Sequence, residues 1–165
     1  MRAHLTQPLK RAALVKRHNI ATIDGDRKRS WGEVRERVAR VAGGMRRLGL
    51  ETGDRVAILA MSSDRYFELH FAIPWAGGAI VPVNTRLSAE EIAYILRDSG
   101  ASMIFVDETQ RHVVSALGEL MADMKAVISL DDQPADDWIS YEGLATNEEP
   151  EEDHLRGGSD MAGIF

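Results

Sequence analysis

The residues best placed to do chemistry lie where a predicted strand ends. Asn84, Thr85 and Arg86 follow a short apolar run and precede a helical pattern that opens near Ser88. They combine backbone donors, a hydroxyl and a guanidinium beside a helix N-terminus, an arrangement that suits an anion. These residue types therefore make a candidate anion site. The alternative is that Asn84 and Thr85 only form a turn and that Arg86 is solvated.

Polar residues also follow the other predicted strands. Ser62-Ser63, Asp107-Glu108 and Asp131-Asp132 each come after a short apolar run. In an open parallel sheet, ligands bind beyond the carboxyl ends of the strands. A ligand of this protein is therefore expected at that edge.

The usual signatures of a self-contained active site do not occur in the sequence. Residues 61–64, after the first long strand, contain no Gly, and there is no G-x-x-x-x-G-K-S/T or G-x-S-x-G motif. Gly43-Gly44 lies within a predicted helix and is interpreted as a place of close packing, because a helix interior offers no free N–H groups. Five His are scattered without metal-ligand spacing and are interpreted as surface or core residues: His4, His18, His70, His112 and His154.

The elements that must position these residues alternate after residue 55. This alternation predicts an α/β fold with a mostly parallel sheet and helices on both faces. Pro82 cannot donate a ladder hydrogen bond, so it is expected at a strand end. The predicted strands are residues 56–60, 79–83, 103–106 and 126–130, and the predicted helices are residues 64–75, 88–98 and 111–121.

A small β-hairpin at about residues 20–31 is predicted to precede this unit, with its turn at Asp24-Gly25-Asp26. Ser30 with Glu33, and Ser88 with Glu91, have the spacing of capping boxes that open helices. The first of these helices should bury an apolar stripe and end near Gly49. The stripe consists of Val34, Val38, Val41, Ala42, Met45 and Leu48.

These elements suggest three parts of the chain. Residues 1–130 are expected to form one α/β subdomain, with the hairpin at about 20–31 and four βα units at about 55–130. Residues 131–160 are acidic and rich in turn formers, and we interpret them as a mostly irregular surface segment with one short helix near 138–145. Residues 161–165 turn apolar again and are expected to begin a further strand.

Composition narrows the class of protein. The 165 residues are 44% hydrophobic and 28% charged, which is ordinary for one globular domain. The absence of Cys excludes a disulfide framework and a cysteine nucleophile. No apolar run reaches the length of a membrane-spanning helix, and residues 1–16 lack the apolar core of a signal peptide. We expect a cytoplasmic protein.

Charge is distributed unevenly along the chain. Residues 1–49 hold thirteen Lys and Arg against four acidic residues, whereas residues 131–160 hold eleven acidic residues against one Arg. The simple interpretation is a solvated basic face and an acidic loop. The alternative is weak contact of the basic N-terminal region with an anionic membrane surface or a phosphate-bearing ligand. Nucleic acid is not an expected partner, because no basic–aromatic pattern, helix-turn-helix or zinc motif occurs.

Several stretches together form a recognisable set. They are Gly-Asp-Arg-Val-Ala-Ile-Leu at 53–59, Ala-Gly-Gly-Ala-Ile-Val-Pro-Val-Asn-Thr-Arg-Leu at 76–87, and the helical pattern at 91–101. This set resembles the N-terminal region of the AMP-forming adenylating enzymes, the family of the acyl-CoA synthetases. Ser-Trp-Gly-Glu-Val at 30–34 resembles that family's entry to its first helix. Residues 82–87 are most similar to the fatty-acid and aryl-acid CoA ligases.

The resemblance implies an activity and its ligands. It implies a ligase that uses ATP, Mg²⁺ and CoA to convert a small-molecule acid, expected to be a fatty acid, into an acyl-adenylate and then an acyl-CoA. It also implies that the CoA nucleotide lies against this subdomain. Arg111 would then offer its guanidinium to a CoA phosphate. The turn that would pack against the adenine comprises Asn84, Thr85, Arg86 and Leu87.

The resemblance also implies what this chain lacks. Residues 159–165 are similar to the strand that, in the family, leads into the loop around the ATP phosphates. We therefore expect the chain to be a catalytically inactive N-terminal part, without the ATP loop or the catalytic Lys. A sheet cut off here should expose an edge and favour self-association. The competing hypothesis is a stand-alone, non-catalytic α/β binding or interaction module.

Overall fold

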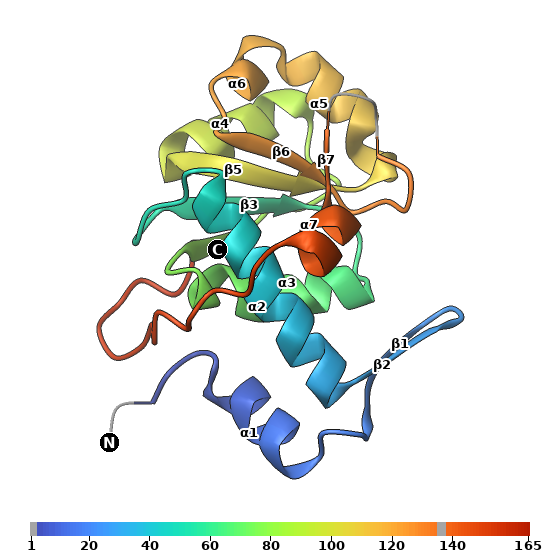
Figure 1. Ribbon diagram of the computed structural model, residues 1–165. Helices are drawn as coiled ribbons and strands as arrows, with labels where there is room; N and C mark the ends of the chain where they lie inside the picture. Colours follow the sequence, from blue (N-terminus) through green and yellow to red (C-terminus); the bar gives the residue numbers. More distant parts are fainter. Residues whose placement is uncertain (1–2, 135–137) are drawn as a thin grey trace.

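A computed structural model describes residues 3–134 and 138–165, so Arg2, Asp136 and Asp137 lie outside the described residues. A parallel sheet carries helices on both faces, and a small antiparallel hairpin stands apart from it (Figure 1). The predicted fold class is confirmed. The helices are α1 (Gln7–Val15), α2 (Trp31–Arg47), α3 (Asp64–Trp75), α4 (Ala89–Ser99), α5 (Arg111–Leu117), α6 (Glu119–Ala122) and α7 (Tyr141–Asn147), with a 3₁₀ turn η1 (Glu108–Gln110).

The hairpin pairs β1 (Ile20–Asp24) with β2 (Arg27–Ser30), as predicted. The sheet has the strand order β4-β3-β5-β6-β7, and all its named pairs are parallel. Pro82 is the last residue of β4, where its missing N–H costs no ladder hydrogen bond. The sheet strands are β3 (Arg55–Leu59), β4 (Ala79–Pro82), β5 (Ala101–Val106), β6 (Ala126–Ser129) and β7 (Ile139–Ser140).

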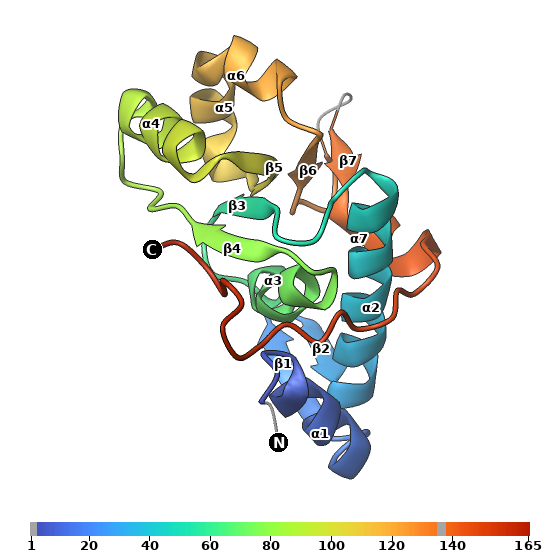
Figure 2. The same cartoon turned by 90° about the vertical axis from the view of Figure 1, so that its left-hand side faces the viewer.

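Alternate strand residues fill two separate cores. Val56 and Ile58 of β3 face the core that includes α2, α3 and α7, whereas Ala57 and Leu59 face the core that includes α4 and α5. The two groups of helices cover opposite faces of the sheet (Figure 2). Burial on both faces explains why the strands are continuous apolar runs rather than alternating ones.

Both predicted capping boxes are present. The Ser30 hydroxyl accepts from the Glu33 N–H while the Glu33 carboxylate accepts from the Ser30 N–H at 2.7 Å. Ser88 and Glu91 repeat this arrangement at the start of α4. These reciprocal bonds satisfy N–H groups that have no partner inside the helix, so each helix begins at its predicted residue.

The structure differs from the sequence-based expectation in three places. The helix predicted over 111–121 is divided into α5 and α6, because Gly118 has a φ of +50° that interrupts the helical path. Helix α1 was not predicted, since only Leu9 and Ala13 of its nine residues are buried. Within the acidic segment, β7 and α7 pack on the domain, and Tyr141 is fully buried.

Residues 161–165 lie beside β4. The Ile80 N–H donates to the Ala162 carbonyl at 3.0 Å, and the Ile164 N–H donates to the Ile80 carbonyl at 2.9 Å. Together they form one isolated parallel bridge between Ile80 and Gly163. Residues 161–165 therefore touch the edge of the sheet at β4 through this one bridge and form no strand of their own. Among the described residues, no helix is both long and apolar enough to cross a membrane.

Candidate functional site

The predicted site residues lie at the carboxyl edge of the sheet. The turn after β4 touches the end of β3, where the Thr85 hydroxyl lies 3.7 Å from the Met61 sulfur. The Met61 N–H in turn donates to the Asp107 carboxylate, after β5, at 2.5 Å. The ends of three neighbouring strands are thereby linked into one polar rim.

The 84–87 turn has a defined internal geometry. The Asn84 side-chain oxygen accepts from the Arg86 N–H at 3.0 Å, so Asn84 shapes the turn itself. Leu87 packs partly against the α4 side of the sheet. The exposed Arg86 side chain makes no hydrogen bond or ion pair within residues 3–134 and 138–165. Within this turn, the Arg86 guanidinium has hydrogen-bond donors that remain available for a ligand.

Arg111 lies farther along the same edge. Its guanidinium donates to the Gln133 carbonyl at 3.1 Å and lies 3.6 Å from Asp131 and 5.8 Å from the centre of the Trp138 ring. Its Nε is buried and has no hydrogen-bond partner in the described part of the chain. The strand order places Arg111 toward β6 and the 84–87 turn beside β4, with β3 between them. The two predicted groups thus share an edge but form no direct contact.

An open hollow of about 580 Å³ adjoins Arg111. Arg65 in its wall is almost fully buried and donates to the Leu130 carbonyl and the Asp132 carboxylate. Arg27 lies 3.6 Å from the same carboxylate. An anion entering the hollow must therefore compete with Asp132 for these guanidinium groups. The lining residues are Arg27, Arg65, Glu108, Arg111, Leu130, Asp131, Asp132 and Gln133.

The described residues include no group of three or more His, Asp or Glu side chains that could hold a metal ion. The carboxylates at the edge are instead engaged in hydrogen bonds. Asp107 accepts from the Thr109 hydroxyl at 2.6 Å, and Asp131 accepts from the Glu108 N–H at 2.9 Å. Their role here is to hold the turns of the rim in place.

A buried ionic network, which sequence reasoning missed, lies behind this edge. Glu68 of α3 is fully buried, and its carboxylate accepts from Arg37 Nε at 2.8 Å and from the Tyr141 hydroxyl at 2.7 Å. Arg37 also donates two hydrogen bonds to Glu142, at 2.7 and 3.0 Å. The network joins α2, α3 and α7. Residues so far apart in sequence left no local pattern that could have revealed it.

Burial and pairing shift the proton affinities of this network in opposite directions. Burial raises the pKa of Glu68 above its ordinary value, and the Arg37 guanidinium and Tyr141 hydroxyl only partly oppose it. Burial also acts to raise the pKa of Glu142, but hydrogen bonds from Arg37 and the charge of Arg65 outweigh it and lower that pKa. Ionised Glu142 therefore stabilises the fold, whereas ionisation of Glu68 costs folding free energy.

The uneven charge along the chain is partly neutralised within the fold. Arg37 and Arg29 of the basic N-terminal region pair with Glu142 of the acidic segment, and Arg47 pairs with Glu148. Arg40 donates to the Glu148 carbonyl at 2.7 Å. The opposite signs of the two segments were the one sequence signal that could have suggested this pairing.

Gly43 and Gly44 allow the C-terminal part of the chain to approach α2 closely. A Cβ at Gly43 would lie 2.1 Å from the Glu149 carbonyl oxygen, and one at Gly44 would lie 2.7 Å from a methyl carbon of Leu144. Both contacts are too short for an alanine without movement. The interpretation of this pair as a place of close packing is confirmed.

Replacing Glu142 with Gln is expected to lower the free energy of unfolding at pH 7 by about 1.5–3 kcal/mol, because charged hydrogen bonds to Arg37 and Arg65 are lost. A carboxylate with a lowered pKa contributes stability above its unfolded-state value of 4.5 and loses it as the pH falls through its folded-state value. The gap between wild type and Glu142→Gln should therefore close in acid. Urea unfolding at a series of pH values measures it.

The matched control for this prediction is Glu149→Gln. Glu149 is exposed, and its carboxylate has no partner among the residues that the structure describes. This variant should unfold like wild type at every pH. A gap for Glu142→Gln that stays constant from neutral to acidic pH would contradict the lowered pKa.

The fold and its polar edge define a class of protein, the N-terminal domains of adenylate-forming enzymes. A protein-family model described as AMP-binding enzyme matches residues 7–165, and the chain belongs to this family. It is 33% identical over 113 residues to a long-chain-fatty-acid–CoA ligase of Thermus thermophilus, covering 68% of this chain and 21% of the relative. It is 36% identical over 132 residues to a feruloyl-CoA synthase of an Amycolatopsis species, covering 78% of this chain and 27% of the relative.

Solved structures agree with this assignment. The inhibitor-bound N-terminal domain of FACL13 from Mycobacterium tuberculosis is 25% identical, with a TM-score of 0.80, and the match covers 99% of this chain and 40% of that one. A benzoate CoA ligase from Burkholderia xenovorans shares the fold with a TM-score of 0.87 at 21% identity, over 99% of this chain and 32% of that one. The chain thus spans about a quarter of the length of the curated relatives that it matches.

Proposed function

We propose that this chain is the N-terminal part of an ATP-dependent, AMP-forming acid–CoA ligase, an enzyme that makes an acyl-adenylate and then an acyl-CoA. The observation that carries the proposal is the family match over residues 7–165. The fatty-acid substrate class rests on the similarity to the Thermus thermophilus ligase and on the stretch at residues 82–87. CoA, when bound, supplies the thiol that receives the acyl group.

Two Arg side chains at the carboxyl edge of the sheet support the assignment of this edge to the phosphate-bearing part of CoA. Arg86 is exposed without a partner in the described chain, and Arg111 lines the open hollow at the same edge. Guanidinium groups with spare donors bind phosphate well. We assign Arg111 to a CoA phosphate, and the turn of Asn84, Thr85, Arg86 and Leu87 to the adenine side of the nucleotide. We assign no residue of this chain to the binding of ATP or Mg²⁺. We therefore propose that the chain is inactive by itself.

Calorimetric titration of the chain with CoA tests this assignment. We expect weak binding, no binding of ATP, and no pyrophosphate exchange with any acid. Arg111→Gln should weaken CoA binding about tenfold or more, because one charged hydrogen bond to phosphate contributes about 1.5–3 kcal/mol. Dephospho-CoA separates the contributions of the 3′-phosphate and the pyrophosphate.

The control variant is Arg97→Gln, which removes an exposed Arg of α4 at a distance from the edge. It should bind CoA like wild type, and a melting curve for each variant shows that the fold is retained. Equal CoA affinity of wild type and Arg111→Gln would overturn the residue assignment. Tight ATP binding or pyrophosphate exchange would overturn the proposal that the chain lacks the adenylating machinery.

A further inference from the structure

Exposed apolar side chains are concentrated near the N-terminus. Of the ten large apolar side chains that are exposed in the described part of the chain, five lie within residues 5–23. Leu14 is 84% exposed and Val15 is 69% exposed, at the C-terminal end of α1. On the inner face of the same helix, Leu9 and Ala13 are buried. The outer end of α1 therefore presents apolar surface that the fold does not use.

Cations without partners surround this apolar surface. Arg11, Lys16 and Arg17 are exposed, and their side chains make no hydrogen bond or ion pair with any residue that the structure describes. No Asp or Glu occurs before residue 24. On the helix, Arg11 lies one turn before Leu14 and Val15, so charge and apolar surface adjoin. We call Arg11, Leu14, Val15, Lys16 and Arg17 the α1 patch.

The acidic groups nearest the α1 patch are mostly engaged elsewhere. Asp153 accepts from the Thr6 hydroxyl at 2.7 Å and from Lys10 Nζ at 3.2 Å, and its side chain is only 4% exposed. Glu36, which shares a hollow with Arg17, pairs with Arg40 at 3.2 Å. Glu152, which lines that hollow with Arg17, is exposed and has no partner in the described part of the chain. The α1 end thus sets three unpaired Lys and Arg against one unpaired Glu, although the whole chain has a net charge of −6.

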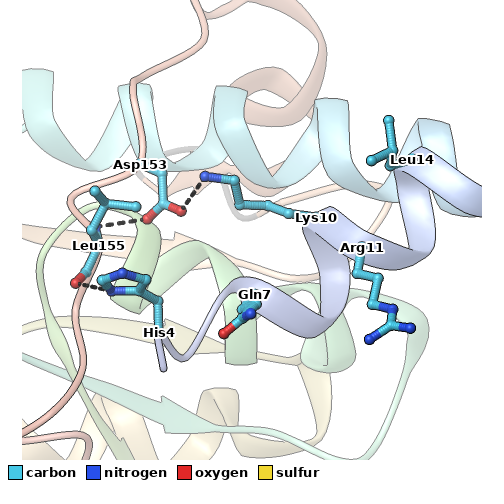
Figure 3. A pocket seen from close by; sticks show the side chains of 7 residues that line it. All are labelled: His4, Gln7, Lys10, Arg11, Leu14, Asp153 and Leu155. Atoms are coloured by element: carbon cyan, nitrogen blue, oxygen red, sulfur yellow. Dashed lines mark hydrogen bonds and ion pairs between the residues drawn. The ribbon is translucent and has the colours of Figure 1, made fainter. Parts of the chain in front are cut away.

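A hollow of about 470 Å³ lies beside the patch, between α1 and residues 153–155. Figure 3 shows Arg11 and Leu14 on α1 and Leu155 on the opposite segment. Leu155 has a φ of +54°, a backbone conformation that Leu rarely adopts. A hydrogen bond of 2.7 Å between His4 Nδ1 and the Leu155 carbonyl oxygen helps to hold this conformation. The Leu155 side chain stays 48% exposed. The hollow is thus lined by Leu14 and Leu155 together with five polar or charged side chains, two of which are cationic.

We propose that the α1 patch docks this protein onto an anionic lipid bilayer. A short helix that presents exposed apolar residues among Lys and Arg is suited to the boundary between headgroups and acyl chains. Anionic headgroups attract the unpaired cations, while Leu14 and Val15 enter the acyl boundary and a lipid occupies the hollow beside Leu155. Because the rest of the chain is acidic, only the α1 end faces the membrane.

Vesicle co-sedimentation tests the docking. The chain should sediment with phosphatidylcholine vesicles that contain about 30% phosphatidylglycerol, but not with phosphatidylcholine alone. Raising NaCl to about 0.5 M should reduce the bound fraction several-fold, because salt screens exposed charges. Leu14→Ser/Val15→Ser and Arg11→Gln/Lys16→Gln should each reduce it about threefold or more.

The matched control is Tyr94→Ser/Arg97→Gln on α4, at the opposite end of the molecule from α1 (Figure 1). It removes one positive charge and a 67% exposed aromatic ring, and should leave the bound fraction unchanged. The proposal is overturned by equal sedimentation with both kinds of vesicle, by no sedimentation, or by an equal loss in the α4 control. A further outcome also overturns it. If the α1 variants lose a dimer in light scattering but still bind vesicles like wild type, the α1 patch is a contact between two copies of the chain rather than a membrane surface.

Discussion

Replacing Gly43 with Ala is expected to lower the free energy of unfolding by about 3 kcal/mol, at the upper end of the usual cost of overpacking. The added Cβ would lie 2.1 Å from the Glu149 carbonyl oxygen. That oxygen belongs to a backbone fixed by Arg47 Nη2 at 3.2 Å, and the adjoining Glu151 N–H donates to the Ala39 carbonyl at 2.9 Å. The segment cannot yield without losing these bonds.

Two other glycines provide an internal scale for this prediction. At Gly44 the added Cβ would meet the flexible end of Leu144 rather than backbone, so Gly44→Ala should cost less than Gly43→Ala. At Gly143, in α7, the nearest atom would be at an ordinary 3.4 Å. Gly143→Ala should therefore stabilise the protein by about 0.5–1 kcal/mol, the difference in helix propensity.

Thermal unfolding separates these three outcomes. A loss of 3 kcal/mol corresponds to a fall in melting temperature of about 6–12 °C for a chain of this size, whereas Gly143→Ala should melt slightly higher than wild type. If Gly43→Ala gains stability as Gly143→Ala does, then residues 148–151 do not lie against α2 in solution. The order Gly143→Ala, Gly44→Ala, Gly43→Ala, from most to least stable, is the expected result.

Removing the buried carboxylate of Glu68 is expected to have an effect of similar size. Glu68→Ala removes the hydrogen-bond acceptor of Arg37 Nε and of the Tyr141 hydroxyl. It also leaves a cavity where the side chain was. Arg37 keeps its hydrogen bonds to Glu142 but is itself buried, so water cannot readily replace the partner that its Nε loses. Breaking one side of a buried ion pair costs about 3–5 kcal/mol. Urea unfolding at pH 7 measures the loss.

The control is another carboxylate that pairs with an Arg of α2. Glu36 pairs with Arg40 at 3.2 Å, but its side chain is 58% exposed. Glu36→Ala should change stability by less than about 0.5 kcal/mol, because water and side-chain entropy offset an exposed pair. The contrast between the two variants isolates the effect of burial.

A double variant tests whether the pair acts as a unit. Arg37→Met/Glu68→Leu removes both charges, and with them the desolvation that raises the pKa of Glu68. It should lose clearly less stability than the sum of the single variants, because neither member of the Arg37–Glu68 pair is left facing the other's empty place. Strict additivity would show that Arg37 and Glu68 stabilise the fold separately. In that case the structure's 2.8 Å contact would contribute little by itself.

The second of these predictions concerns contacts that lie behind the carboxyl edge of the sheet. Arg65, in the wall of the hollow beside Arg111, donates to Glu142 at 2.9 Å, and Glu142 binds Arg37. The candidate binding edge is thus continuous with the buried network through hydrogen bonds. A CoA phosphate bound at Arg111 would rest on a rigid support, as precise recognition requires.

Much of the architecture could be predicted from local sequence. The hairpin, the capping boxes at Ser30 and Ser88, and four sheet strands follow from turn residues and periodicity alone. These patterns involve only a few neighbouring residues, so they can be recognised without knowing how the rest of the chain folds. The candidate edge was also predictable, because parallel strands must end on the same side.

Local sequence did not determine which distant residues meet. The separation of Arg111 from Asn84 depends on the strand order, and a strand's residues do not encode its neighbours. The pairing of Arg37 with Glu68 and Glu142 depends on three helices packing together, and so does the burial of Tyr141 in a segment that reads as acidic surface. Sequence alone determined the hairpin, the two capped helix starts, four sheet strands and the edge at which those strands end. Only the tertiary structure decided the charge pairing, because long-range contacts form between surfaces that folding creates.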